Sequence, residues 1–324
     1  VLRESNDFAC VLLDAGGNSL AQSSLSVPSF IGTLPLSLKR FLEIFPAETL
    51  EPGDVIISND PWMCSGHLPD VTMTMPIFRE DRLIAFAGCI GHVPDMGGRV
   101  RSGDSTEIYE EGLQLPPSKL IKAGRWNDDL ISVILRNVRV PDMVMGDFRA
   151  LIAAAEMLAR RLGNLMKEQG IENLESLAVT IQNTSEKAIR DAIRALPDGS
   201  YSHELWMDGF DEPLKVKLRL DIKEDQIFCD YTGTAPQINR GLNTVLNYTY
   251  AYTVYPLKCA VYPTVPNNEG CFRPFTVTAP EGCLLNPKYP AAVGGRAMVG
   301  HYLTTAVFGA LQKIIPERIQ ADCG

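Results

Sequence analysis

The sequence predicts an α+β fold of mixed, largely antiparallel sheets with a helical hairpin and a second β-rich lobe. Three observations support this fold class. Residues 71–78 alternate apolar and polar side chains, and the charged turn 79–82 leads into the apolar run 83–90. Residues 141–169 repeat apolar side chains at helical spacing, and strand-like alternation returns after Tyr201. Strands joined by tight turns pair antiparallel, whereas a regular βαβα alternation would predict a parallel sheet.

The first 140 residues are expected to form an α/β region. Its predicted elements are a buried strand over 8–13, a helix over 34–45, and strands over 55–58, 71–78 and 83–90. Residues 93–130 are rich in glycine and proline and are predicted to be mostly loop. Long loops beside a site are more often functional than idle.

Residues 141–200 are expected to form a helical hairpin. Pro141-Asp142 opens the first helix and Gly170 ends it, and a second helix is predicted from about 173 to 196. Residues 201–324 are expected to form the β-rich lobe, with a terminal helix. The predicted elements are strands over 214–222, 227–231 and 275–279 and a helix over 299–314.

Composition narrows the class of protein. The formal net charge is -9 and no basic stripe is present, so nucleic acid is not an expected partner. No apolar run approaches the roughly 18 residues that a membrane span needs. The eight cysteines form no Cys-x-x-Cys pair, which favours reduced thiols in a cytoplasmic protein. The chain begins at Val1 without signal-peptide character, and we expect it to be part of a longer polypeptide.

The most informative stretch is 59–70, which ends in Gly-His-Leu-Pro-Asp. His67 and Asp70 are three residues apart, and Pro69 between them allows a turn that brings both side chains to one point. A second Gly-His, ending at His92, follows the predicted strand 83–90. Antiparallel pairing of 71–78 with 83–90 would bring His92 back to the start of the hairpin. Two imidazoles and a carboxylate form a plausible site for a divalent metal ion.

The same pattern has a simpler interpretation. A His-x-x-Asp pair can be a hydrogen-bonded turn in which the carboxylate only orients the ring.

His203 and His301 are isolated and are expected to pack or cap. Arg273 and Arg296 could meet a carboxylate or phosphate or form structural ion pairs. The chain has no phosphate-binding loop, no nucleophile elbow and no His-Glu-x-x-His helix, so ATP would have to be bound by another polypeptide.

The order of motifs resembles the B subunit of ATP-dependent N-methylhydantoinases. This family includes the C-terminal half of 5-oxoprolinase and subunits of acetone and acetophenone carboxylases. The resemblance covers the whole chain and is most specific in Asn59-Asp60-Pro61-Trp62, Gly66-His67-Leu68-Pro69-Asp70-Val71-Thr72, Gly91-His92 and Asp230-Tyr231-Thr232-Gly233-Thr234-Ala235-Pro236-Gln237. Two departures occur: Val93 stands where a second histidine is common, and Val93-Pro94-Asp95 replaces a usual His-Ala-Asp.

The resemblance implies a single divalent metal ion, zinc or manganese. Its implied ligands are His67, Asp70 and His92, with Asp7 as a fourth and Asp14 as a weaker candidate for that place. Asp60 or Asp95 would act as a catalytic carboxylate by fixing a ligand imidazole. Glu111 also stands in a matching block, Glu111-Gly112-Leu113.

The resemblance also implies a function. The chain would be the metal-binding subunit of an ATP-dependent cyclic-amide hydrolase, acting on a carbonyl phosphorylated by an ATP-binding, hydantoinase A-like partner in a hetero-oligomer. The alternatives are a subunit of an ATP-dependent ketone carboxylase and a non-catalytic scaffold. Partner contact is expected in 93–130, whose apolar side chains are numerous for a solvated loop: Ile108, Tyr109, Leu113, Leu115, Leu120 and Ile121.

Overall fold

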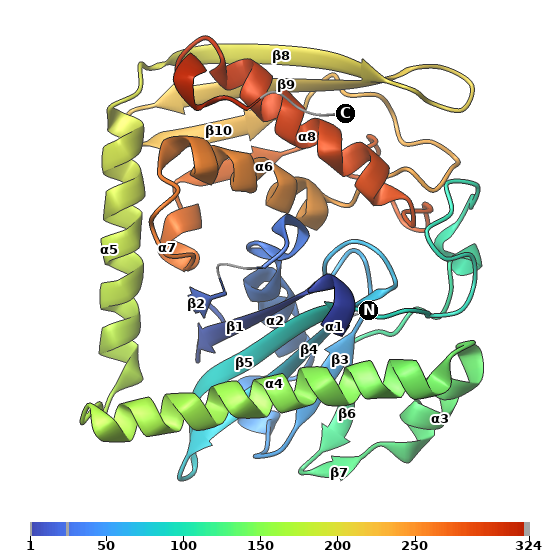
Figure 1. Cartoon of the computed structure of the whole chain (residues 1–324), viewed down its shortest axis with the longest axis vertical. Coiled ribbons are helices and arrows are strands. Elements are labelled where there is room, and N and C mark those ends of the chain that lie inside the picture. Colours follow the sequence, from blue (N-terminus) through green and yellow to red (C-terminus); the bar gives the residue numbers. More distant parts are fainter. Residues whose placement is uncertain (1, 24–25, 321–324) are drawn as a thin grey trace.

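A computed structural model describes residues 2–23 and 26–320 and confirms the α+β fold (Figure 1). Two separate sheets are present, one of seven strands and one of four. All pairings in the larger sheet are antiparallel, and the smaller sheet has a single parallel pair, β10 (Gln226–Asp230) with β11 (Phe275–Thr278). The mixed, largely antiparallel character expected from the sequence is therefore confirmed.

The seven-stranded sheet has the order β2-β1-β5-β4-β3-β6-β7. Its strands are β1 (Phe8–Asp14), β2 (Ser19–Gln22), β3 (Val55–Ser58), β4 (Asp70–Arg79), β5 (Arg82–His92), β6 (Ser118–Lys122) and β7 (Arg125–Trp126). The hairpin of β4 and β5 lies at its centre and pairs from Asp70↔His92 to Arg79↔Arg82. The first and last residues of this hairpin are therefore two of the predicted ligands.

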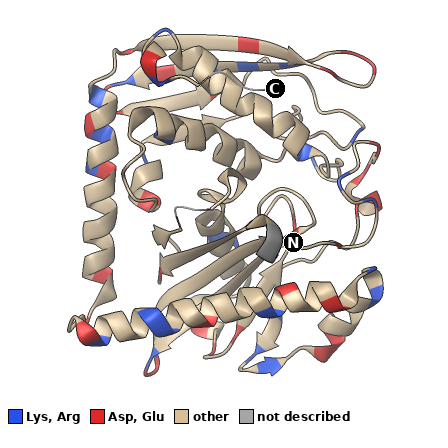
Figure 2. Ribbon diagram, viewed as in Figure 1, with Lys and Arg blue, Asp and Glu red and all other residues tan. Residues whose placement is uncertain are grey.

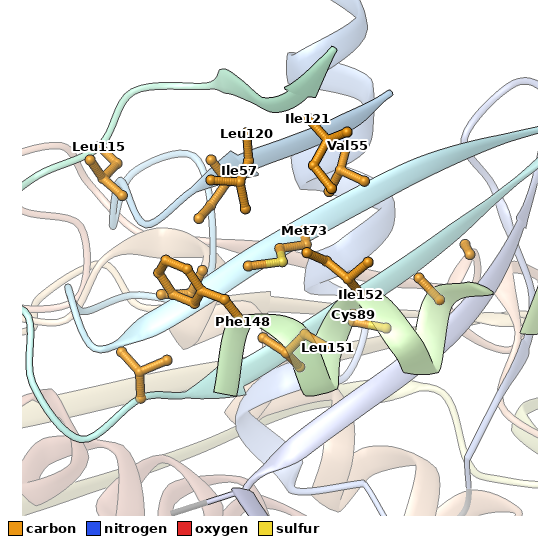
Figure 3. Close-up of a cluster of buried hydrophobic side chains, with 14 of the residues drawn as sticks. Val55, Ile57, Met73, Cys89, Leu115, Leu120, Ile121, Phe148, Leu151 and Ile152 are labelled. Atoms are coloured by element: carbon orange, nitrogen blue, oxygen red, sulfur yellow. The ribbon is translucent and has the colours of Figure 1, made fainter. Parts of the chain in front are cut away.

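Helices cover both faces of this sheet. Helix α4 (Pro141–Glu168) places Phe148, Leu151 and Ile152 over Met73 of β4 and Cys89 of β5 (Figure 3). Helix α2 (Thr33–Ile44) packs its apolar side chains, including Leu34 and Leu38, on the opposite face. Burial on both faces explains why residues 83–90 form an apolar run without clean alternation.

Helix α5 (Leu174–Arg194) follows α4 directly, as expected for the helical pair, but the two helices do not pack along each other. In Figure 1 α4 crosses the large sheet, whereas α5 rises from its edge toward the second sheet. Helix α5 packs against the short helix α7 (Glu269–Phe272), where a Cβ on Gly270 would meet the Gln182 carbonyl at 1.9 Å. Helix α4 is therefore held by its contacts with the large sheet, and α5 by its contacts with both sheets and α7.

The four-stranded sheet has the order β11-β10-β9-β8 and forms the expected β-rich lobe. Its strands are β8 (Gly199–Met207), β9 (Leu214–Lys223), β10 (Gln226–Asp230) and β11 (Phe275–Thr278). Helix α8 (Arg296–Leu311) covers this sheet and packs against α6 (Leu246–Val261). Sequence analysis missed α6, because Pro256 interrupts it and most of its side chains are buried, which leaves no polar stripe to reveal the helical period.

The segment 93–130 has more regular structure than expected, and it buries most of the apolar residues that were expected to contact a partner. It contains β6, β7 and the start of α3 (Asp128–Asn137). Ile108, Leu115, Leu120 and Ile121 are buried in the core of their own chain, and only Tyr109 is largely exposed. These four side chains therefore need no partner protein to cover them, whereas contact of a partner with 93–130 stays a prediction.

Charged residues of both signs are interspersed along α4 and α5 (Figure 2). Among the described residues, no helix is both long and apolar enough to cross a membrane. The remaining short elements are α1 (Leu2–Ser5) and the single-turn helices η1 (Pro28–Phe30), η2 (Ala47–Thr49), η3 (Ile108–Glu110) and η4 (Pro316–Arg318).

Candidate metal centre

The predicted cluster assembles where three neighbouring strands end. Asp70 begins β4 and pairs with His92, the last residue of β5. His67 lies in the turn before β4, where the Asp70 amide donates to the His67 carbonyl at 3.1 Å. Asp7 immediately precedes β1, and its carbonyl accepts the His92 amide at 3.0 Å. Turn and register together place all four residues at one edge of the sheet.

Three side-chain atoms converge at this edge. The Asp70 Oδ1 atom lies 2.8 Å from His67 Nε2 and 2.9 Å from His92 Nδ1, and the two nitrogens are 3.1 Å apart. All three side chains are at most 6% exposed. Among the described residues they form a group with metal-ligating atoms within 4.8 Å of one another.

The second lobe closes the site from above. Arg296, at the start of α8, pairs with Asp70 Oδ2 and lies 4.0 Å from the ring centroid of Tyr248 on α6. The Gly294 carbonyl is 3.4 Å from His67 Nδ1. A cavity of about 550 Å³ opens here and is lined by the cluster, Asp7, Arg101 and Arg296. Such a volume suits a small molecule.

Electrostatics keep the centre ready to bind a cation. Burial, followed by the positive charge of Arg296, lowers the pKa of His67 to about 4, so its imidazole is neutral near pH 7. Burial opposes ionisation of Asp70, but His67, Arg296 and hydrogen bonds from both imidazoles outweigh it and hold the Asp70 pKa well below its usual range. A neutral imidazole and an ionised carboxylate are the states that bind metal ions.

Asp7 lies in the wall of the same cavity, although its carboxylate is not within the 4.8 Å cluster. Burial and the neighbouring charge of Asp70 raise the pKa of Asp7. Repulsion between two carboxylates is the interaction that a cation between them would relieve. Asp7 is thus placed to serve the cluster, either as a ligand or as a nearby charge.

The other predicted carboxylates lie elsewhere. Asp14 ends β1 at its far end, where its carboxylate accepts hydrogen bonds from Asn18 and Gln182. Asp60 accepts from the Trp62 amide and the Gln114 side chain. Asp95 caps the Gly97 amide and pairs with Arg139 at 2.7 Å. None of these three lines the cavity, and their hydrogen bonds within the described residues do not reach an imidazole.

Glu111 is a functional candidate whose role sequence reasoning left open. Its buried carboxylate accepts from the amides of Val293 at 2.9 Å and Gly294 at 2.7 Å. Burial raises its pKa to about 7. Because the Gly294 carbonyl faces His67, Glu111 fixes the backbone beside the cluster. Only the match of the Glu111-Gly112-Leu113 block indicated it, since its partners lie 182 and 183 residues away in the sequence.

The donor set fits a divalent metal ion. A tetrahedral ion with bonds of about 2.05 Å needs ligand atoms about 3.3 Å apart, only a few tenths of an ångström more than observed. Two imidazoles and one or two carboxylates suit zinc or manganese, and the donor set does not choose between them. The hydrogen bond between His67 and Asp70 is also present. The same contact therefore fits both a metal site and a carboxylate that only orients the imidazole.

The class of the protein is that of hydantoinase B and oxoprolinase, as its family pattern shows. The sequence pattern of the family described as Hydantoinase B/oxoprolinase matches residues 1–324, and the chain belongs to this family.

Relatives agree with this assignment. A protein from Pseudomonas sp. (strain NS671), provisionally named as the B subunit of a D-/L-hydantoinase, is 34% identical over 100% of this chain and 58% of its own length. The beta subunit of the caprolactamase of Pseudomonas jessenii is 29% identical over 100% of this chain and 57% of its own. The chain therefore spans a little over half the length of these relatives.

Solved structures show the same fold. The crystal structure of ATP-dependent caprolactamase from Pseudomonas jessenii aligns with a TM-score of 0.90 and 28% identity, over 96% of this chain and 55% of that chain. A nucleotide-free acetone carboxylase structure aligns with a TM-score of 0.90 at 19% identity, over 99% of this chain and 46% of that chain. At that identity the second comparison establishes the fold alone.

Proposed function

We propose that this chain is the metal-binding part of an ATP-dependent cyclic-amide hydrolase of the hydantoinase and oxoprolinase type. The observation that carries the proposal is the buried convergence of His67, Asp70 and His92 beside a cavity of about 550 Å³. Relatives named for hydantoin, oxoproline and caprolactam chemistry support a ring-opening reaction.

His67, Asp70 and His92 would hold one zinc or manganese ion, with Asp7 as the candidate fourth ligand. When bound, such an ion supplies Lewis acidity that polarises a carbonyl or activates water. Arg296 keeps Asp70 ionised, and Glu111 fixes the Gly294 carbonyl near His67. Residues of α6 and α8 lie over the cluster and limit the access of bulk water to it.

ATP has a clear chemical use in such a reaction. An unstrained amide resists attack by neutral water, whereas phosphorylation of its oxygen turns that oxygen into a leaving group. Two relatives are named as B and beta subunits, which supports a hetero-oligomer with an ATP-binding, hydantoinase A-like subunit that performs this phosphorylation. We also propose a cytoplasmic setting, in line with the spacing of the cysteines in the sequence.

A ketone carboxylase subunit is the second candidate. The fold shared with acetone carboxylase favours it, and the same ligands would serve an enolate. The amide-hydrolase assignment is preferred because the relatives named as hydantoinase, oxoprolinase and caprolactamase are 26–34% identical over nearly the whole chain. A scaffold that binds no metal is the third candidate.

The test is to purify the full-length subunit with its ATP-binding partner and supply two kinds of substrate. One set contains hydantoin, 5-oxoproline or caprolactam with ATP; the other contains acetone or acetophenone with ATP and ¹³C-bicarbonate. We expect ring-opened product and phosphate release from the first set. Incorporation of ¹³C into a carboxyl group would instead identify the carboxylase, and no turnover by metal-replete protein with either set would favour the scaffold.

Site variants make this test specific. His67→Ala and His92→Ala should abolish turnover and metal retention while the protein stays folded. His203→Gln is the matched control, because His203 lies on β8 and packs against α8 outside the cavity. Full activity in metal-free protein or in His67→Ala would contradict the assignment.

A further inference from the structure

The two arginines of the cavity are held very differently. Arg296 is 4% exposed, pairs with Asp70 and lies over the Tyr248 ring. Arg101 is exposed, and its side chain donates one hydrogen bond within the described residues, from Nη2 to His92 Nε2 at 2.9 Å. Arg101 has a φ of 52°, in the left-handed region that a non-glycine residue seldom occupies. Arg296 is therefore committed to the cluster, whereas the Arg101 side chain is held, within the described residues, by a single hydrogen bond.

That contact requires a specific tautomer of His92. A carboxylate only accepts hydrogen bonds, and Asp70 Oδ1 faces His67 Nε2 at 2.8 Å and His92 Nδ1 at 2.9 Å. Both nitrogens therefore carry their hydrogens toward Asp70. A neutral imidazole has one N–H, so His92 Nε2 carries a lone pair and accepts from Arg101.

Metal binding reverses both tautomers. Ligation needs lone pairs on His67 Nε2 and His92 Nδ1, so each hydrogen must move to the other ring nitrogen. For His67 the new Nδ1–H faces the Gly294 carbonyl at 3.4 Å, the kind of acceptor that ligand histidines usually have. For His92 the new Nε2–H faces the Arg101 guanidinium, which has only donors. Two donors cannot share a hydrogen bond, and the guanidinium would also stand near a dication.

Once a metal ion is bound, the cavity attracts a negatively charged ligand, which the displaced guanidinium can bind. Its charged lining residues are Asp7, Asp70, Arg101 and Arg296, whose formal charges sum to zero. A divalent ion changes this sum to +2, so the loaded cavity favours a negatively charged ligand. The guanidinium fork matches a phosphate group with two parallel hydrogen bonds.

We propose that Arg101 is the phosphate-binding residue of this cavity and is released from His92 when a divalent ion binds. Metal and the phosphate group of an activated substrate then bind with positive coupling, because the metal frees the residue that the phosphate needs. The inference rests on the proposed function, which supplies both the metal and the phosphorylated carbonyl.

The test measures manganese binding by electron paramagnetic resonance and phosphate binding by calorimetry, on the full-length subunit. The probes are Mn²⁺ alone and inorganic phosphate, and His67→Ala defines binding outside the cluster. Arg101→Ala is the variant. Arg99→Ala is the matched control, since Arg99 lies two residues away on the same loop, pairs with Glu110 at 3.6 Å and does not line the cavity.

We expect Arg101→Ala to bind Mn²⁺ about tenfold more tightly, the equivalent of one charge-assisted hydrogen bond removed. In the presence of Mn²⁺ the same variant should bind phosphate about tenfold more weakly, while Arg99→Ala matches the unchanged protein in both measurements. Unchanged or weaker Mn²⁺ binding by Arg101→Ala, or phosphate affinity independent of Arg101, would overturn the inference and leave the proposed metal centre standing. Absence of Mn²⁺ and Zn²⁺ binding in the unchanged protein would overturn both.

Discussion

The two ends of strand β1 carry similar side chains and differ in chemistry. Asp7 lies just before the strand, beside the His67, Asp70 and His92 cluster, and Asp14 is its last residue. The cavity at the Asp14 end is the larger, about 820 Å³ against 550 Å³. Asp14 accepts from Asn18 and Gln182, and Gln182 in turn accepts from Arg273 at 2.8 Å.

The difference teaches that the partners of a carboxylate, and not the size of a cavity, define a metal site. At the Asp14 end the carboxylate faces amide N–H groups, which offer a cation no lone pair, and the side-chain oxygen of Gln182 already accepts from Arg273. At the Asp7 end the central carboxylate faces two imidazoles, which become ligands by exchanging a hydrogen between their own nitrogens. Substitutions at the two ends test whether this distinction holds.

The largest effect is expected from removing the central carboxylate. Asp70→Ala leaves Arg296 as a buried, unpaired cation and should lower the free energy of unfolding by about 3–5 kcal/mol. It should also abolish stoichiometric metal binding. Asp14→Ala at the other end should cost only about 1–2 kcal/mol, because its lost partners are neutral amides. Urea denaturation of metal-free protein measures both losses, and equal losses would remove the distinction.

The pH dependence of stability offers a second test. Burial lowers the His67 pKa to about 4 from about 6.5. The unfolded state therefore binds this proton first, and the free energy of unfolding falls as pH drops from 6.5 to 4. Burial raises the Glu111 pKa to about 7 from 4.5. The folded state therefore holds this proton longer, and the free energy of unfolding falls as pH rises from 4.5 to 7. Between pH 4.5 and 6.5 these opposite slopes nearly cancel.

The substitution Glu111→Gln removes the pH dependence of stability that comes from Glu111 and leaves the one that comes from His67. In metal-free protein the variant should gain about 2 kcal/mol of unfolding free energy between pH 5 and 6.5 relative to the unchanged protein, since one pKa unit is about 1.4 kcal/mol. Denaturant titrations at several pH values measure this change. The same pH profile in both proteins would show that Glu111 ionises normally.

Glu111 should also influence metal affinity without touching the metal. Glu111→Ala removes the acceptor that holds the Val293 and Gly294 amides, so the carbonyl facing His67 becomes less well positioned. We expect a loss of about tenfold in Mn²⁺ or Zn²⁺ affinity, the low end for residues that orient a ligand histidine. Glu111→Gln retains an accepting oxygen and should lose less. Equal affinity in Glu111→Ala and the unchanged protein would count against this role.

The smallest effects are expected for the two carboxylates that sequence analysis proposed as catalytic. Asp60→Asn and Asp95→Asn alter contacts with Trp62, Gln114, Gly97 and Arg139, all outside the cavity. Metal affinity should stay within about threefold, because neither carboxylate lines the cavity or shares a partner with the cluster. Loss of bound metal in either variant would restore its predicted role.

Much of the fold could be predicted because its signals are local. The strands 55–58, 71–78 and 83–90 and the helix beginning at Pro141 were found within a few residues of their actual bounds. Hairpin pairing then placed His92 beside Asp70 correctly. Helix α6 was missed because nearly all of its faces are buried, so it has no polar stripe to reveal its period.

By itself the sequence determined many of the elements, the family and the three residues that converge, because period, turn chemistry and strand pairing are properties of neighbouring residues. Only the tertiary structure decided which groups surround them. Arg296 reaches Asp70 across 226 residues and Glu111 reaches Gly294 across 183, and no local pattern encodes such partners. Packing of the second lobe over the strand ends brought Arg296 and Gly294 to the site, whereas Asp14, Asp60 and Asp95 lie outside the cavity.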